Sequence, residues 1–123
     1  MDYHYISIVI PVFNVDTKIL NKSLESISKQ TYSFYEVIII DDSTDLECSK
    51  FCFDYCSSDN RFRYYKTEKR LGLSKSLNFG ISISKYDLIA RFDSDDICFL
   101  NRLELQINYL NSNNHIDVLG GAM

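Results

Sequence analysis

Short apolar runs alternate along the chain with segments whose apolar residues recur at helical spacing. The runs are continuous and rich in β-branched residues, which is typical of strands buried on both faces of a sheet. They span residues 5–13, 36–40, 62–66 and 86–92, and one more begins at 116–119. The helical segments span 17–31, 45–58, 73–81 and 101–111. The pattern therefore predicts strands and helices in alternation.

This alternation predicts an α/β fold, a Rossmann-like and mostly parallel sheet with helices on both faces. The 123 residues suffice for one domain with one core. In sheets of this kind, ligands bind outside the carboxyl ends of the strands. The residues that follow each strand are therefore the candidates for function.

Carboxylates gather at three of these strand ends. They are Asp16 after the first strand, Asp41 and Asp42 after the second, and Asp93, Asp95 and Asp96 after the fourth. Bringing like charges together is costly unless a cation or hydrogen-bond donors offset them. The pattern predicts a divalent metal, sugar hydroxyls or base N–H groups as partners. Hard oxygen ligands suit Mg²⁺ or Mn²⁺.

An aspartate that precedes a helix can instead be its N-cap. For Asp45, at the start of the helix predicted at 45–58, capping is the favoured interpretation. For Asp93, Ser94 and Asp95 a functional role is favoured, because three acids within residues 93–96 exceed what a cap requires.

Three blocks of the chain, in order, resemble family 2 glycosyltransferases. The first is SIVIPVFN at 7–14, similar to the strand S-V-I-I-P-x-Y-N that opens these enzymes. The second is SISKQTYSFYEVIIIDDST at 26–44, similar to their S-I-L-x-Q-T and E-I-I-V-V-D-D-G-S-T blocks. The third is RLGLSKSLNFGISISKYDLIARFDSDD at 70–96, similar to N-x-G-x-x-x-A-x-N-x-G followed by the D-x-D strand. The resemblance runs from Ser7 to Arg102.

The resemblance implies the A-type glycosyltransferase fold, whose Rossmann-like half binds a nucleotide-diphosphate sugar. The residues it places on the nucleotide pocket are Pro11, Val12, Phe13, Asn14 and Asp16, the last where the family usually has Glu. Asp42 matches the acid that binds the base, usually uracil. Asp93 and Asp95 match the D-x-D pair, with Ser94 between them. Asp93 is expected to lie near the ribose and to contact the metal ion, and Asp95 is expected to bind the metal ion. The ion is expected to be Mn²⁺ or Mg²⁺.

The glycine segment matches the family less closely. Gly72, Asn78 and Gly80 match, whereas Leu71 and Ser76 replace commoner residues. Gly72 gives its turn backbone freedom. The resemblance places Lys75 or Arg70 near the diphosphate, and a solvated helix face accounts equally well for Lys75.

The family's catalytic base is an Asp or Glu downstream of the D-x-D, in the acceptor-binding half. We therefore expect residues 1–123 to be the nucleotide-sugar-binding part of a truncated domain, with the acceptor half absent and the base beyond residue 123. Asp117 is interpreted as structural and His115 as a solvated loop residue. An uncovered sheet edge then predicts marginal stability or self-association.

The composition narrows the partners and the location. A net charge of −4 disfavours a nucleic-acid surface. The chain lacks both a spanning apolar stretch and a signal-peptide pattern, which predicts a cytoplasmic protein. Peripheral association with the inner face of the membrane, through the missing C-terminal region, is left open.

Cys48, Cys52 and Cys56 recur at helical spacing. An apolar, core-facing stripe is favoured over a thiol metal site.

The resemblance implies a metal-dependent, inverting transferase. It would move a sugar from a nucleotide-diphosphate sugar, expected to be a UDP-sugar, to an acceptor. The acceptor would be a glycan or lipid-linked molecule in bacterial surface polysaccharide synthesis. The alternative is a fragment that binds a nucleotide sugar without turnover. A dinucleotide oxidoreductase is rejected because PVFNVD follows the first strand where G-x-G-x-x-G is required. A phosphoacceptor receiver domain does not explain the ordered blocks.

Overall fold

The computed structural model describes residues 5–112, and within them strands and helices alternate as predicted. The element order is β1 (Ile6–Val12), α1 (Thr17–Ser28), β2 (Tyr35–Asp41), α2 (Leu46–Ser58), β3 (Phe62–Lys66), α3 (Leu73–Ser82), β4 (Leu88–Arg91) and α4 (Arg102–Ser112). The apolar run predicted at 116–119, His115 and Asp117 lie outside the described residues. None of the described helices is long and apolar enough to cross a membrane.

The four strands form one parallel sheet in the order β3-β2-β1-β4. β1 lies between β2 and β4, and Ile6 pairs with Tyr35 on one side and Leu88 on the other. All four carboxyl ends therefore meet at one edge of the sheet. The predicted α/β class is confirmed.

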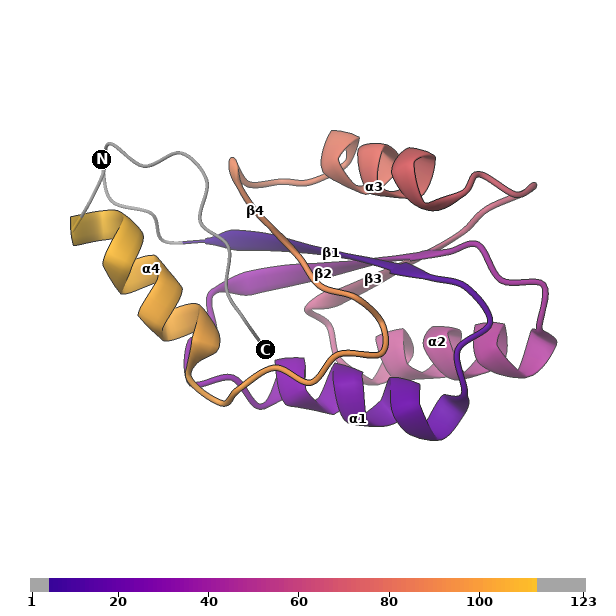
Figure 1. Ribbon diagram of the computed structural model, residues 1–123, viewed down its shortest axis with the longest axis horizontal. Coiled ribbons are helices and arrows are strands. Elements are labelled where there is room, and N and C mark those ends of the chain that lie inside the picture. The colour runs from indigo at the N-terminus through magenta and orange to yellow at the C-terminus, as the bar shows by residue number, and fades with distance from the viewer. Residues whose placement is uncertain (1–4, 113–123) are drawn as a thin grey trace.

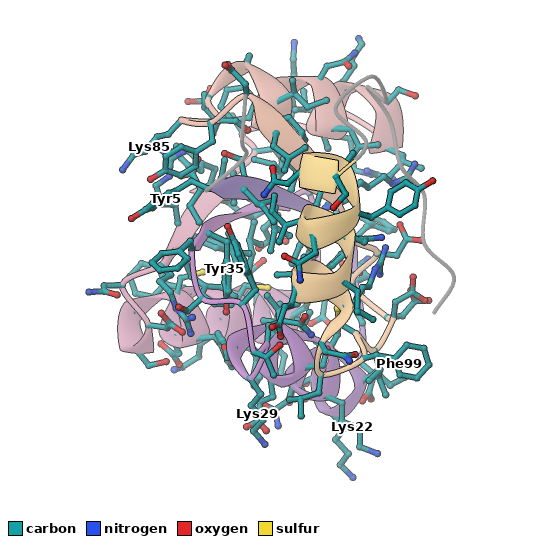
Figure 2. All side chains as sticks on the ribbon, turned by 90° about the vertical axis from the view of Figure 1, so that its left-hand side faces the viewer. Tyr5, Lys22, Lys29, Tyr35, Lys85 and Phe99 are labelled. Atoms are coloured by element: carbon teal, nitrogen blue, oxygen red, sulfur yellow. The ribbon has the colours of Figure 1, made fainter. Side chains whose placement is uncertain are left out.

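The helices cover the two faces of the sheet unequally. Figure 1 shows α1 and α2 on one face, α3 on the other, and α4 beside one end of the sheet. The main core lies between the sheet and the paired helices, and includes Ile8, Ile10, Leu20, Leu24, Val37 and Ile39. In Figure 2, Lys22 and Lys29 extend from α1 away from the molecule, whereas Tyr35 lies inside it.

Helix α1 ends at Ser28, earlier than the predicted residue 31. The N–H groups of Lys29 and Gln30 close the last turn. The side chain of Gln30 then donates to the carbonyl of Phe99 and accepts from the N–H of Leu103. Gln30 therefore links the end of α1 to the segment that leads into α4.

Helix α3 presents a different face to the sheet from the one its apolar spacing predicts. Leu73 and Ile81 are 54% and 48% exposed, and the buried residues of the helix are Ser76 and Gly80. A Cβ atom on Gly80 would lie 2.4 Å from Cγ1 of Val9 in β1. This helix therefore approaches the sheet through its smallest side chains.

The cysteine stripe of α2 faces the core, as favoured from the sequence. Cys48 and Cys52 are fully buried and Cys56 is half-buried. Burial raises the pKa of Cys52, and raises the pKa of Cys56 to about 12, so both stay protonated at neutral pH. Within residues 5–112, no three His, Cys, Asp or Glu side chains are grouped to hold a metal ion.

Candidate functional site

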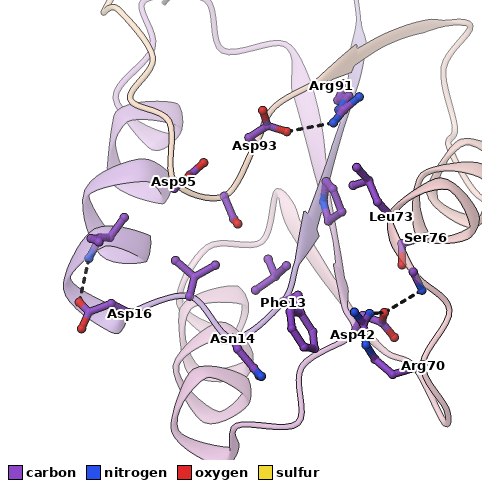
Figure 3. Close-up of a pocket in the computed structure, with 16 residues that line it drawn as sticks. Phe13, Asn14, Asp16, Asp42, Arg70, Leu73, Ser76, Arg91, Asp93 and Asp95 are labelled. Carbon is purple, nitrogen blue, oxygen red and sulfur yellow. Dashed lines mark hydrogen bonds and ion pairs between the residues drawn. The ribbon is translucent and has the colours of Figure 1, made fainter.

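A pocket of about 720 Å³ opens at the carboxyl edge of the sheet (Figure 3). Its walls come from the β1–α1 loop, the start of α3, the residue after β2, and the turn after β4. The lining residues are Pro11, Val12, Phe13, Asn14, Val15, Asp16, Ile19, Asp42, Arg70, Gly72, Leu73, Ser76, Arg91, Asp93, Ser94 and Asp95. The pocket lies where the topology of a parallel sheet places ligands.

Asp42 holds the loop that leads into α3. Its carboxylate accepts from the N–H groups of Leu71 and Gly72, each at 3.0 Å, from the hydroxyl of Thr67 at 2.7 Å, and from Arg70. Burial opposes ionisation of this group, but these donors outweigh it and lower the pKa of Asp42 to about 2. Asp42 is therefore a buried anion whose oxygens are engaged by its own loop.

Gly72 is the residue that allows this loop to close. Its φ of +82° lies in the left-handed region, which glycine adopts without the cost that a Cβ imposes. In this conformation its N–H points to Asp42, while its carbonyl accepts the N–H of Ser76 in the first turn of α3. The backbone freedom predicted for Gly72 is therefore used.

Arg70 and Phe13 form the outer part of the same wall. The Arg70 guanidinium lies 3.8 Å from the centre of the Phe13 ring and bonds to the Asp42 carboxylate. Both side chains are about half exposed. A flat aromatic face under a cation is a surface on which a planar group stacks.

Asn14 ties two loops of the pocket together. It has a φ of +48°, and its side-chain oxygen accepts the N–H groups of Thr44 and Asp45, both at 2.9 Å. Its side-chain nitrogen donates to the Thr44 hydroxyl. The Asn14 amide is therefore used to join the β1–α1 loop to the β2–α2 loop.

Two of the aspartates that follow strands, Asp16 and Asp45, act as helix N-caps. Asp45 accepts the N–H of Glu47 at the start of α2, which confirms its capping role. Asp16 accepts the N–H groups of Lys18 and Ile19 at the start of α1, and it also lines the pocket.

The turn after β4 gathers three carboxylates. Asp93 and Asp95 are exposed and line the pocket, and the N–H of Asp96 donates to the carbonyl of Asp93 at 3.2 Å. Burial of its carboxyl and the charges of Asp93 and Asp95 raise the pKa of Asp96. Arg91 forms an ion pair with Asp93 at 3.2 Å.

Most of the residues predicted from the sequence meet at this one pocket. Those that line it are Pro11, Val12, Phe13, Asn14, Asp16, Asp42, Gly72, Asp93, Ser94 and Asp95. Lys75 and Asn78 do not line it; both are exposed on α3. The solvated-face interpretation of Lys75 agrees with this position. The individual roles of the lining residues stay predictions.

Several residues that line the pocket were not predicted from the sequence. Val15, Ile19, Leu73 and Ser76 form part of its wall, and Arg91 enters from the end of β4. A signal that could have found Arg91 is its place at the end of β4, two residues before Asp93. Residues at i and i+2 of an extended chain share a face, so this spacing can bring a cation beside that carboxylate.

The carboxylates fit a divalent cation with hard oxygen ligands. Asp93 and Asp95 supply two carboxylates to one pocket. Mg²⁺ and Mn²⁺ commonly take one or two protein carboxylates and complete their shell with water and substrate phosphates. Within residues 5–112 no third such side chain is grouped with them, so substrate or water oxygens would have to complete the shell.

Comparison with known proteins agrees with this arrangement. The family model described as glycosyl transferase family 2 matches residues 7–123. An uncharacterized glycosyltransferase of Methanocaldococcus jannaschii is 34% identical over 97% of this chain and 41% of its own length. The O-antigen biosynthesis glycosyltransferase WbnJ of Escherichia coli is 41% identical over 88% of this chain and 42% of its own length.

Solved structures show the same fold at lower identity. TarS of S. aureus superposes with a TM-score of 0.76 at 21% identity, over 100% of this chain and 23% of its own. The mannosyltransferase PcManGT of Pyrobaculum calidifontis, solved with GDP-Man and Mn²⁺, gives a TM-score of 0.72 at 15% identity, over 86% of this chain and 31% of its own. The chain thus spans less than half the length of these relatives. Its fold is the A-type glycosyltransferase fold, and the chain belongs to glycosyl transferase family 2.

Proposed function

We propose that this chain forms the donor-binding part of a metal-dependent, inverting glycosyltransferase that uses a nucleotide-diphosphate sugar, most simply a UDP-sugar. The observation that carries the proposal is the meeting of residues from three separate sequence blocks at one pocket. An aromatic face, a buried carboxylate and a pair of exposed carboxylates lie around the same space. These groups suit a base, a ribose and a diphosphate held with a cation.

Each part of the donor has a candidate partner. The base would stack against Phe13, beside Asp42 and Arg70, and the ribose would lie near Asp93. Asp95, with Asp93, would hold the Mn²⁺ or Mg²⁺ ion, which when bound neutralises the charge of the leaving diphosphate. A mannosyltransferase with this fold was solved with GDP-Man and Mn²⁺, which supports a donor of this class.

The acids that line the pocket already have other roles. Asp16 caps α1, Asp42 holds the loop before α3, and Asp93 and Asp95 fit the metal. Deprotonation of an acceptor hydroxyl requires a base on the side opposite the leaving group. We therefore propose that the base, and the surface for a glycan or lipid-linked acceptor, lie outside the residues that line this pocket. The relative WbnJ, an O-antigen biosynthesis glycosyltransferase, supports a role in surface polysaccharide synthesis. We propose that this role is carried out on the cytoplasmic side.

The donor site is tested by titrating the purified chain with UDP, with and without Mn²⁺, by calorimetry. We expect binding that requires Mn²⁺ and falls at least about tenfold in Asp95→Ala, because a lost metal ligand typically costs that much affinity or more. Asp54→Ala, an exposed acid on α2 far from the pocket, is the matched control and should bind as the wild type does. A folded chain that does not bind UDP would refute the proposal. Binding of the donor without turnover would favour the non-catalytic alternative.

A further inference from the structure

The pocket contains two arginines that differ in how firmly they are held. Arg70 is bonded to a carboxylate that is 3% exposed and lies against the Phe13 ring. Within residues 5–112, Arg91 forms its one ion pair with Asp93. The side chains of Arg91 and Asp93 are 51% and 52% exposed. An exposed pair of this kind contributes little to stability, because solvent screens it. Arg91 is therefore the pocket cation that a ligand can recruit at low cost.

The sheet fixes the position of Arg91 although its side chain is exposed. Arg91 is the last residue of β4 and pairs with Val9 of the central strand. The next N–H, that of Phe92, donates to the Val9 carbonyl at 3.2 Å, and the Phe92 side chain is buried. Since successive side chains of a strand point to opposite faces, burial of Phe92 directs Arg91 to the other face. Figure 3 shows its guanidinium beside Asp93 at the pocket.

Asp93 is also one of the two carboxylates that fit a divalent cation. Arg91 and the cation therefore compete for the same carboxylate. A cation bound to Asp93 would leave the Arg91 guanidinium without this ion-pair partner at the wall of the pocket. A guanidinium binds phosphate oxygens through two parallel N–H bonds, which a lysine does not reproduce.

We propose that Arg91 is a diphosphate-binding residue of the donor site, held on Asp93 until the metal displaces it. The inference rests on the proposed function and deepens it. In this role Arg91 adds a fixed positive charge next to the metal, where the negative charge of the departing nucleoside diphosphate develops. Two residues were considered for this role from the sequence. Lys75 is exposed on α3 outside the pocket, whereas Arg70 lines the pocket and is bonded to Asp42.

The test compares three ligands on the wild type and on Arg91→Met. With Mn²⁺ present, we expect Arg91→Met to bind UDP about 10- to 100-fold more weakly, the range for a lost charge-assisted hydrogen bond. Uridine, measured by competition against UDP, should bind both proteins within about twofold, because it has no phosphate. Mn²⁺ alone should bind Arg91→Met at least as tightly as the wild type, because its competitor for Asp93 is gone. Arg91→Lys should recover part of the UDP affinity.

Lys50→Met, which removes an exposed cation on α2, is the matched control and should change none of the three affinities. Equal loss of UDP and uridine, or weaker Mn²⁺ binding by Arg91→Met, would overturn the proposal in favour of a structural role. Unchanged UDP binding by Arg91→Met would overturn it as well. Failure of the wild type itself to bind UDP would instead count against the proposed function.

Discussion

Gly80→Val is expected to lower the free energy of unfolding by about 3 kcal/mol, because overpacking a well-packed core costs about 1–3 kcal/mol or more. The first added carbon already lies 2.4 Å from Val9 Cγ1 and 3.4 Å from Ile40 Cγ1. Val9 is fully buried in the central strand and has a stiff, β-branched side chain. The clash is therefore relieved only if α3 moves away from the sheet, and α3 carries one wall of the pocket.

Urea unfolding followed by circular dichroism measures this loss. Ser82→Val places the same side chain at an exposed position of the same helix and should change stability by about 0.5 kcal/mol or less. A Gly80→Val protein as stable as the wild type would mean that α3 does not pack against β1 as closely as described.

The second large effect is expected for Asp42→Asn, which should cost about 2–4 kcal/mol at pH 7. The N–H groups of Leu71 and Gly72, the Thr67 hydroxyl and Arg70 all donate to this carboxylate. An amide has one acceptor oxygen, and its NH₂ group would face donors, so buried N–H groups lose their partner. The 67–72 loop should therefore loosen. Hydrogen exchange at Leu71 and Gly72 reports this directly.

The contribution of Asp42 to the free energy of unfolding should also depend on pH. Its pKa is lowered from 3.8 to about 2 in the folded chain, so the folded state favours the ionised form. Stability from this group is thus fully present above about pH 5 and is lost as the pH falls through 4 toward 2, by roughly 2–3 kcal/mol in all. The stability gap between wild type and Asp42→Asn should narrow over that window. A gap of constant size would show that ionisation of Asp42 is not what holds the loop.

The sequence was enough to predict the layers of the fold and the edge of the sheet where the site lies. The runs at 5–13 and 36–40 are apolar apart from Ser7 and Glu36, because β1 and β2 are covered on both faces. The acids after them stand out because charge in a buried strand is costly unless it is paired. Their meeting at one pocket then follows from parallel strand order alone.

What the sequence did not predict depends on how residues distant in the chain approach one another. The face that α3 turns to the sheet does not follow from the helical spacing of Leu73, Leu77 and Ile81. The short distance to Val9 selects Ser76 and Gly80 instead. The structural work of Asn14, which caps N–H groups of residues 44 and 45, was likewise hidden because its partners come from another loop.

The order of the strands also governs how the chain acquires its site during synthesis. β1 is made before the other three strands of the sheet, yet its two neighbours are β2 and β4, and its pairing with β4 requires Leu88–Arg91. At translation rates of about 5–20 residues per second, the apolar edge of β1 waits for seconds before its second partner exists. The nascent chain therefore carries a half-paired hydrophobic strand until β4 has been made. Chaperone capture or premature association is expected to act on that strand first.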